Sequence, residues 1–136
     1  MYYLIQFTWG LPLNIIGFIV YIILSKICKF WSYKYRKAFY VVVPWNFGGV
    51  SLGMFIIHGE KNYDLRVHEY GHSIQNLMWG WLMPVVIAIP SAIRYWYRKF
   101  LIKIGKTLKT SYYDIWFEKQ ATELGTRASK NEWSWI

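Results

Sequence analysis

Arg66-Val67-His68-Glu69-Tyr70-Gly71-His72-Ser73-Ile74-Gln75 is the stretch around which the rest of the chain is organised, because it contains the pattern His-Glu-x-x-His. Residues four apart lie on one face of an α-helix, so His68 and His72 can present imidazole nitrogens to a single metal ion. Glu69 is turned enough to reach a water molecule beside that ion. The pattern predicts a zinc site if a helix surrounds it and a third ligand comes from elsewhere. The alternative is two surface histidines that flank a glutamate.

The residues on either side of the motif predict the helix that it needs. The side chain of Asp64 can cap a helix that begins at Leu65, and Gly80 is suited to end it. The motif therefore lies where a helix is expected.

The composition is unusual for a soluble domain. Of the 136 residues, 55% are hydrophobic and 21% are aromatic, with nine Trp and twelve Tyr. Long apolar runs with Trp and Tyr near their ends indicate a membrane protein, because these rings settle at the level of the lipid headgroups. The net charge of +9 could indicate nucleic acid binding, but the basic residues gather after two apolar runs and no nucleic-acid-binding motif occurs. We therefore expect a lipid bilayer as a partner, and no nucleic acid.

The chain has one cysteine, Cys28, which limits the disulfides and metal sites that it can form. One thiol excludes an intrachain disulfide and any zinc site that is built from cysteines.

Residues 1–25 are predicted to form an N-terminal transmembrane anchor. No charged residue occurs from position 2 to position 24, and about 20 apolar residues span a bilayer. A cleaved signal peptide is the alternative, but it needs a basic start and a small-residue cleavage site, and this stretch has neither. Basic residues follow directly at 26–37, so the positive-inside rule places that end in the cytoplasm. Residues 26–136 are expected to form one membrane-associated domain.

Residues 38–43 and 49–58 are rich in β-branched and aromatic side chains, and residues 44–49 between them have the composition of a turn. This pattern predicts a β-hairpin. Such a strand could line a cleft and pair with an extended peptide, or it could merely cover the helices.

The second apolar run, residues 76–93, contains Pro84 and Pro90. Its length is close to that of a membrane span, but a single span would place the basic residues 94–109 opposite the first basic cluster. A re-entrant or interfacial hairpin bent at the two prolines keeps both clusters on one side. We expect the hairpin, with the span as the alternative.

Glu118 is the candidate for the third metal ligand. Ser111-Tyr112-Tyr113-Asp114 has the form of a capping box, which predicts a helix that ends at Gly125. Ala121 and Gly125 share the face of Glu118, so this helix could closely approach Gly71 in the motif.

Other residues are candidates for supporting roles. Glu123 is the next choice for the third ligand. The candidates for stabilising an oxyanion are His58, Tyr112 and Tyr113 by chemical type, and Asp114 or Gln75 could orient a ligand imidazole.

The residues His68-Glu69-Tyr70-Gly71-His72, followed by Glu118-Lys119-Gln120-Ala121, resemble the gluzincin metallopeptidases, whose pattern is H-E-x-x-H and a later E-x-x-A or E-x-x-A-D. The resemblance covers about residues 65–125. It is greatest to small bacterial membrane-associated proteins with an H-E-Y-G-H motif, and more distant to the CAAX prenyl protease type.

The resemblance implies that His68, His72 and Glu118 bind Zn²⁺ and that Glu69 is the general base. One position departs from the pattern, because Thr122 stands where an aspartate often orients a ligand histidine.

Together these features predict a mainly α membrane protein with a small β-hairpin, which is a minimal gluzincin-like zinc peptidase core plus an N-terminal transmembrane helix. We expect it in a bacterial cell membrane with its active site on the cytoplasmic side, hydrolysing a peptide or membrane-protein substrate by a zinc-activated water with Glu69 as base. The alternative, favoured by Thr122, is a catalytically inactive membrane protein of the same fold that serves as a binding or assembly module. The sequence leaves the substrate and the oligomeric state open.

Overall fold

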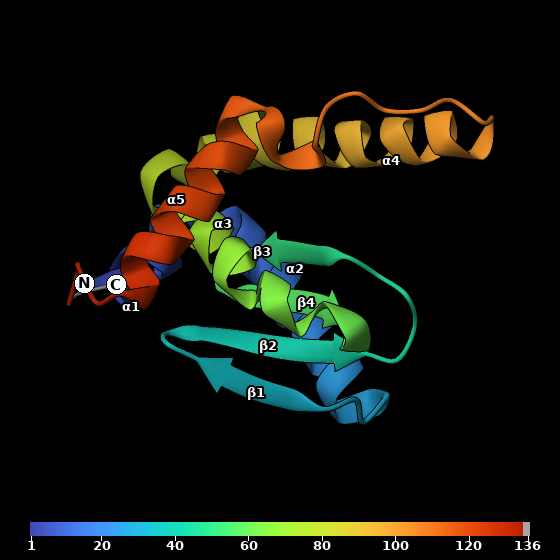
Figure 1. The fold of residues 1–136 in the computed structure, drawn as a ribbon. Coiled ribbons are helices and arrows are strands. Elements are labelled where there is room, and N and C mark those ends of the chain that lie inside the picture. Colours follow the sequence, from blue (N-terminus) through green and yellow to red (C-terminus); the bar gives the residue numbers. More distant parts are fainter. Residues whose placement is uncertain (135–136) are drawn as a thin grey trace.

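The computed structural model describes residues 1–134, so the last two residues of the predicted domain 26–136 lie outside the described part. The protein is mostly helical and is built around a small mixed sheet (Figure 1). The α-helices are α1 (Tyr2–Phe7), α2 (Leu11–Ile22), α3 (Arg66–Trp79), α4 (Ile89–Lys103) and α5 (Trp116–Ser129). The strands are β1 (Ser32–Tyr35), β2 (Ala38–Val43), β3 (Gly49–Leu52) and β4 (Phe55–Gly59).

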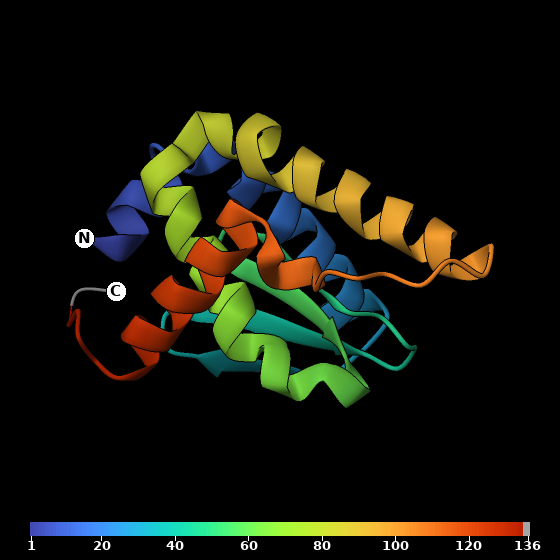
Figure 2. The same ribbon diagram turned by 45° about the horizontal axis from the view of Figure 1, so that its top comes forward.

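The elements form layers. Helix α2 lies on one face of the sheet, α3 lies on the other, and α5 packs on the outer side of α3 (Figures 1 and 2). Helix α4 extends as an arm beyond the rest of the molecule, and the chain returns from its tip toward α5 (Figure 2).

The strand order is β1-β2-β4-β3, which corrects the predicted hairpin. Residues 49–58 do not form one strand that pairs back on β2. They divide into β3 and β4, which pair antiparallel with each other, while β4 lies parallel to β2 and β1 pairs antiparallel with β2. Strand β3 is therefore at an edge of the sheet.

A contact from α2 explains why residues 49–58 divide. Gly53, between β3 and β4, has φ of 69°, a left-handed conformation that favours glycine. The Asn14 side chain occupies the space where a side chain at Gly53 would lie, and its Oδ1 accepts a hydrogen bond from Met54 N at 2.8 Å. The turn is thus stabilised by a residue forty positions away, which local composition could not reveal.

The single anchor helix predicted within residues 1–25 is also corrected, because the chain breaks at 8–10 into α1 and α2. Polar side chains at the break are buried and bonded to one another. Asn14 Nδ2 donates to Gly10 O and Gln6 Oε1, and Gln6 Nε2 donates to Ser73 O. These bonds attach the N-terminal segment to α3.

Among the described residues, no single helix has both the length and the hydropathy that a membrane span requires. The helical segments Glu60–Leu82 and Pro84–Lys103 pass the same test only as a pair, which is bent by 117°. The bend lies beside Pro84, where the sequence predicted one, but the second segment continues through Pro90, where a bend was also predicted.

Helix α3 carries the His-Glu-x-x-His motif, as expected, and ends at Gly80, whose φ is 51°. The predicted cap by Asp64 is wrong. A 3₁₀ helix, Glu60–Leu65, runs directly into α3, and the Asp64 side chain is exposed near Arg66. Since the preceding turn continues into the helix, no side-chain cap forms at Leu65.

The capping box at Ser111 forms, but it caps a single 3₁₀ turn, Tyr112–Asp114, and α5 begins only after the extended residue Ile115. Gly125 does not end α5, which continues to Ser129. Gly125 instead lies against the backbone of Val67, and Gly71 lies against the backbone of Ala121. The predicted close approach of these two helices is confirmed. It allows side chains from α3 and α5 to meet at the candidate site.

Candidate metal centre

Three side chains from α3 and α5 converge between these two helices. His68 and His72 lie one turn apart on α3, and Glu118 enters from the first turn of α5. Glu118 Oε2 is 3.1 Å from His68 Nε2 and 3.2 Å from His72 Nε2, and one ligand atom from each residue lies within 4.8 Å of the others. All three residues are buried, with exposed fractions of 8%, 8% and 0%.

The outer nitrogen of His68 faces Thr122. The distance from His68 Nδ1 to Thr122 Oγ1 is 2.8 Å, and the Thr122 hydroxyl donates its own proton to Glu118 O at 3.1 Å. Because that proton is already engaged, the oxygen can only accept from His68. His68 therefore carries its proton on Nδ1 and directs the lone pair of Nε2 toward Glu118.

The outer nitrogen of His72 is held in the same way by Gln75. The two distances from Gln75 Nε2, to Phe117 O and to Gln120 Oε1, are 2.8 and 2.9 Å, so both protons of the amide are donated. Its Oε1 lies 2.7 Å from His72 Nδ1 and accepts from it. Both imidazoles are therefore oriented as metal-binding histidines usually are.

Such a group of atoms requires a positive charge. Two imidazole lone pairs and a carboxylate oxygen, all acceptors, point at one buried position, and acceptors this close repel one another unless a proton or a cation lies between them. Burial is the largest single effect on His72 and would lower its pKa, but the hydrogen bond to Glu118, the charges of Glu69 and Glu118 and the bond to Gln75 together raise that pKa. In the same way, burial would raise the pKa of Glu118, but bonds to His68 and His72 hold it well below its usual range.

The other carboxylate oxygen of Glu118 is held by α4. Ser91 Oγ donates to Glu118 Oε1 at 2.6 Å, and the hydroxyl of Tyr112 lies 2.6 Å from the same Ser91 oxygen. Nothing in the sequence around Ser91 indicated this role. Its position depends on the segment after α4, which returns from the tip of the arm and brings the start of α5 beside Ser91.

Glu69 also belongs to this site. It is buried, and its carboxylate lies directly against Gly49 of β3, so closely that a side chain at Gly49 would meet it. Burial raises the pKa of Glu69, although His72 and His68 act in the opposite direction. The first residue of β3 therefore fixes where the Glu69 carboxylate can lie.

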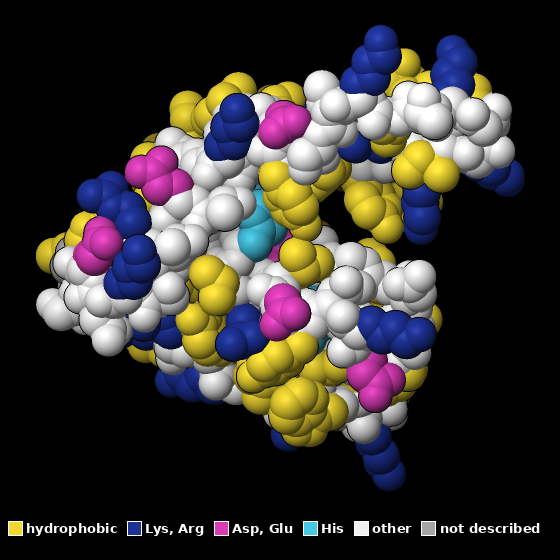
Figure 3. Space-filling model, viewed as in Figure 1, with side chains coloured by type: hydrophobic (Ala, Val, Ile, Leu, Met, Phe, Trp, Pro, Cys, Tyr) yellow, Lys and Arg dark blue, Asp and Glu magenta, His cyan; other side chains and the backbone are white. Residues whose placement is uncertain are grey.

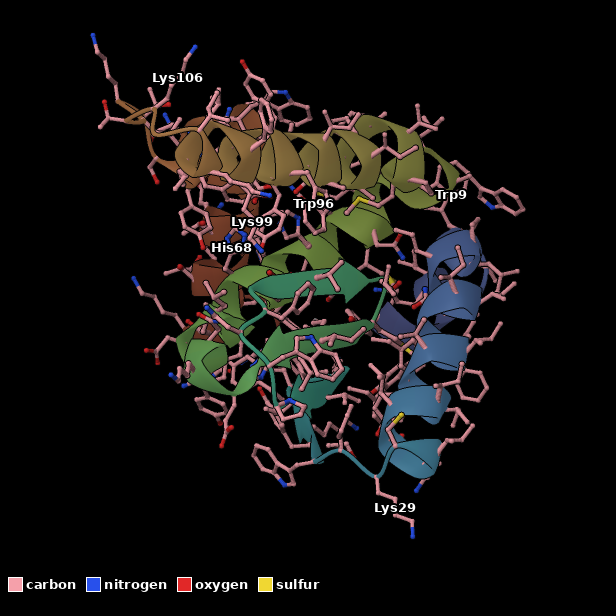
Figure 4. The ribbon with its side chains drawn as sticks, turned by 90° about the vertical axis from the view of Figure 1, so that its right-hand side faces the viewer. Trp9, Lys29, His68, Trp96, Lys99 and Lys106 are labelled. Atoms are coloured by element: carbon pink, nitrogen blue, oxygen red, sulfur yellow. The ribbon has the colours of Figure 1, made fainter. Side chains whose placement is uncertain are left out.

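The site opens into a cleft of about 480 Å³. Figure 3 shows the hollow between the arm and the body of the molecule, with a histidine side chain visible at its inner end. In Figure 4, Trp96 and Lys99 point from α4 into the gap on the side where His68 lies. The cleft walls are β3, α4 and the turn at Tyr112, and His68, Glu69, His72 and Glu118 form part of its lining.

Several residues that the sequence suggested lie elsewhere. His58 is on β4 beside a second cavity, where its Nε2 is 2.8 Å from the Tyr33 hydroxyl. Glu123 is exposed and pairs with Arg127 at 3.8 Å. Asp114 accepts from Ser111 N in the capping box rather than from an imidazole. Tyr112 and Tyr113 do line the cleft.

Comparison with known proteins gives no match: no family model, curated protein or solved structure is significantly similar to this chain. The geometry of the site is therefore the main indication of what the protein does.

Proposed function

We propose that the protein is a zinc-dependent peptidase in which His68, His72 and Glu118 bind the metal and Glu69 is the general base. The observation that carries the proposal is the convergence of three buried acceptor atoms, with both imidazoles oriented by acceptors on their outer nitrogens. Two histidines and one carboxylate are a usual ligand set for catalytic zinc, because they leave a fourth position open. The resemblance to gluzincins supports the same set.

A zinc ion bound here would act as a Lewis acid and lower the pKa of a water molecule toward neutrality. Glu69 is suited to take the proton of the attacking water and pass it to the leaving amine, because it lies at the same site and burial raises the pKa of its carboxyl group. Tyr113 is the better candidate for stabilising the oxyanion. Its ring packs on His68 with 4.8 Å between centroids, whereas the Tyr112 hydroxyl is engaged by Ser91.

The walls of the cleft favour an extended peptide as substrate. Strand β3 is at the edge of the sheet and borders the cleft, so a peptide backbone could add to it as a further strand. Apolar side chains from α4 and the preceding turn, such as Ile87 and Ile102, line the opposite wall. Peptides with apolar side chains near the cleaved bond suit this surface.

The alternative of a catalytically inactive module rested on Thr122. That residue now has an orienting role, because its hydroxyl accepts from His68 as an aspartate would. Thr122 therefore no longer favours the inactive module over the peptidase.

The test is metal content and peptide hydrolysis in the same preparations. We expect about one zinc ion per chain and cleavage of apolar peptides, detected by mass spectrometry, that a chelator abolishes and zinc restores. The variant Glu69→Gln should keep the metal and lose roughly 10²–10⁴-fold in hydrolysis, whereas Glu118→Gln should lose the metal.

The matched control is Glu123→Gln, which removes an exposed carboxylate from the same helix and should keep both metal and activity. A wild-type protein that takes up no zinc contradicts the proposal. So does a Glu69→Gln variant that hydrolyses peptides at the wild-type rate.

A further inference from the structure

The outer side of the arm carries a continuous apolar stripe. Its members lie on α4 and the residue that follows, at spacings of three and four, so they fall within about 80° of the helix circumference. We call Ile89, Ile93, Tyr97, Phe100 and Ile104 the outer stripe. Each is more than half exposed, with Ile93 at 64% and Phe100 at 56%. Trp81, Leu82 and Val85, in the bend before α4, are exposed beside its start.

The charges around this stripe have a single sign. From residue 80 to residue 109 there are six Lys and Arg residues and no Asp or Glu. Figure 3 shows basic side chains along the arm, and Lys106 lies at its tip in Figure 4. An exposed apolar stripe flanked by basic residues matches a surface with an apolar interior and anionic groups at its boundary.

We infer that α4 binds to the surface of an anionic lipid bilayer, lying in the plane of the membrane with the outer stripe inserted among the lipids. A second copy of the chain fits less well, because two such arms would bring like charges together. The inference goes beyond peptide hydrolysis and does not depend on it.

An in-plane position is favoured over a spanning one by where the charges are. Arg94 and Arg98 lie in the middle of α4, and their guanidinium groups donate to backbone oxygens of residues 110–112. If α4 crossed the bilayer, both would lie at hydrocarbon depth, which is strongly unfavourable. In the plane of the membrane they remain at the level of the headgroups.

The opposite side of α4 lines the cleft, with Ser91, Tyr95 and Lys99 among its residues. Binding of the outer stripe would therefore place the mouth of the cleft at the membrane surface, where segments of membrane-associated peptides emerge.

The test is depth measurement by spin labels on the full-length chain. In a Cys28→Ser background, single cysteines at Ile93 and Phe100 are labelled with a nitroxide, and Lys109 is labelled as the aqueous control. Accessibility to oxygen and to a nickel complex is then measured with vesicles of phosphatidylcholine alone and with phosphatidylglycerol added. The labels are on the arm itself, so they report the depth of the arm even if another part of the chain also binds the vesicles.

We expect the labels at 93 and 100 to lie at equal depth below the headgroups, more so with phosphatidylglycerol, and the label at 109 to remain in water. Three results would overturn the inference. The labels at 93 and 100 could stay in water with both kinds of vesicle. Their depths could instead differ by the rise of seven helical residues, about 10 Å, as in a spanning helix. Finally, spin–spin broadening without lipid would show that the stripe is covered by a second copy. Circular dichroism shows for each variant that the fold is kept.

Discussion

Thr122 shows how a single hydroxyl can serve in place of a carboxylate. Its proton is donated to Glu118 O within its own helix, which leaves the oxygen to accept from His68 Nδ1 at 2.8 Å. An aspartate would add negative charge beside the ligand, whereas threonine orients the imidazole without adding any. The site keeps the geometry that a metal needs with one fewer charge buried around it.

The role of Thr122 leads to a test on the metal alone. Thr122→Val has nearly the same shape but no acceptor, so His68 should lose its fixed orientation and zinc affinity should fall about 10–100-fold. Titration against a competing chelator measures this. Thr122→Ser keeps the hydroxyl and should bind close to the wild-type affinity. A valine variant with unchanged affinity would show that Thr122 only packs against the ring.

At the scale of elements, the site depends on three close approaches. Helices α3 and α5 meet through Gly71 and Gly125, which brings Glu118 to the two histidines. Strand β3 approaches α3 through Gly49, which positions Glu69. Helix α4 supplies Ser91 to the far oxygen of Glu118. In each case, the contact with a second element holds a side chain of the candidate site in place.

The contact between β3 and α3 can be tested separately from metal binding. In Gly49→Ala the added methyl group would meet the Glu69 carboxylate and displace it. A displacement of about 1 Å should lower hydrolysis roughly 10²-fold while zinc remains bound. Gly48→Ala is the matched control, because its nearest neighbour would be Tyr95 Cε2 at 3.9 Å, an ordinary contact. Equal activity of the two variants would contradict the positioning of Glu69 by β3.

At the scale of the whole molecule, the proposed metal joins two helices that are far apart in the sequence. The ligands on α3 and α5 are separated by 46 and 50 residues. A ligand that binds only the folded chain stabilises it by about 4 kcal/mol when present at a thousand times its dissociation constant.

Removal of zinc should therefore lower the melting temperature by an amount on the order of 10 °C, as measured by scanning calorimetry before and after chelation. The difference should disappear in Glu118→Gln, which cannot complete the site, and persist in Glu123→Gln. A chelator effect of equal size in Glu118→Gln would place the stabilising ion elsewhere.

The sequence by itself determined what depends on local spacing. The i, i+4 relation of His68 and His72 predicted a helix with both imidazoles on one face, and Gly80 predicted its end; α3 confirms both. The small residues around Glu118 correctly predicted that its helix would pack closely on Gly71. These features follow from backbone geometry over one or two turns, which is the same wherever the segment lies.

Only the tertiary structure decided what depends on distant contacts. The break between α1 and α2 is stabilised by bonds among Gln6, Asn14 and Ser73, and the division of residues 49–58 depends on Asn14 at Gly53. The bond from Ser91 to Glu118 likewise requires the segment after α4 to bring the start of α5 back to the start of α4. A hydrogen bond between residues far apart in sequence leaves no periodic pattern, so the sequence could suggest Gln75, three residues after His72, as a partner for a ligand imidazole, but not Ser91 as a partner for Glu118.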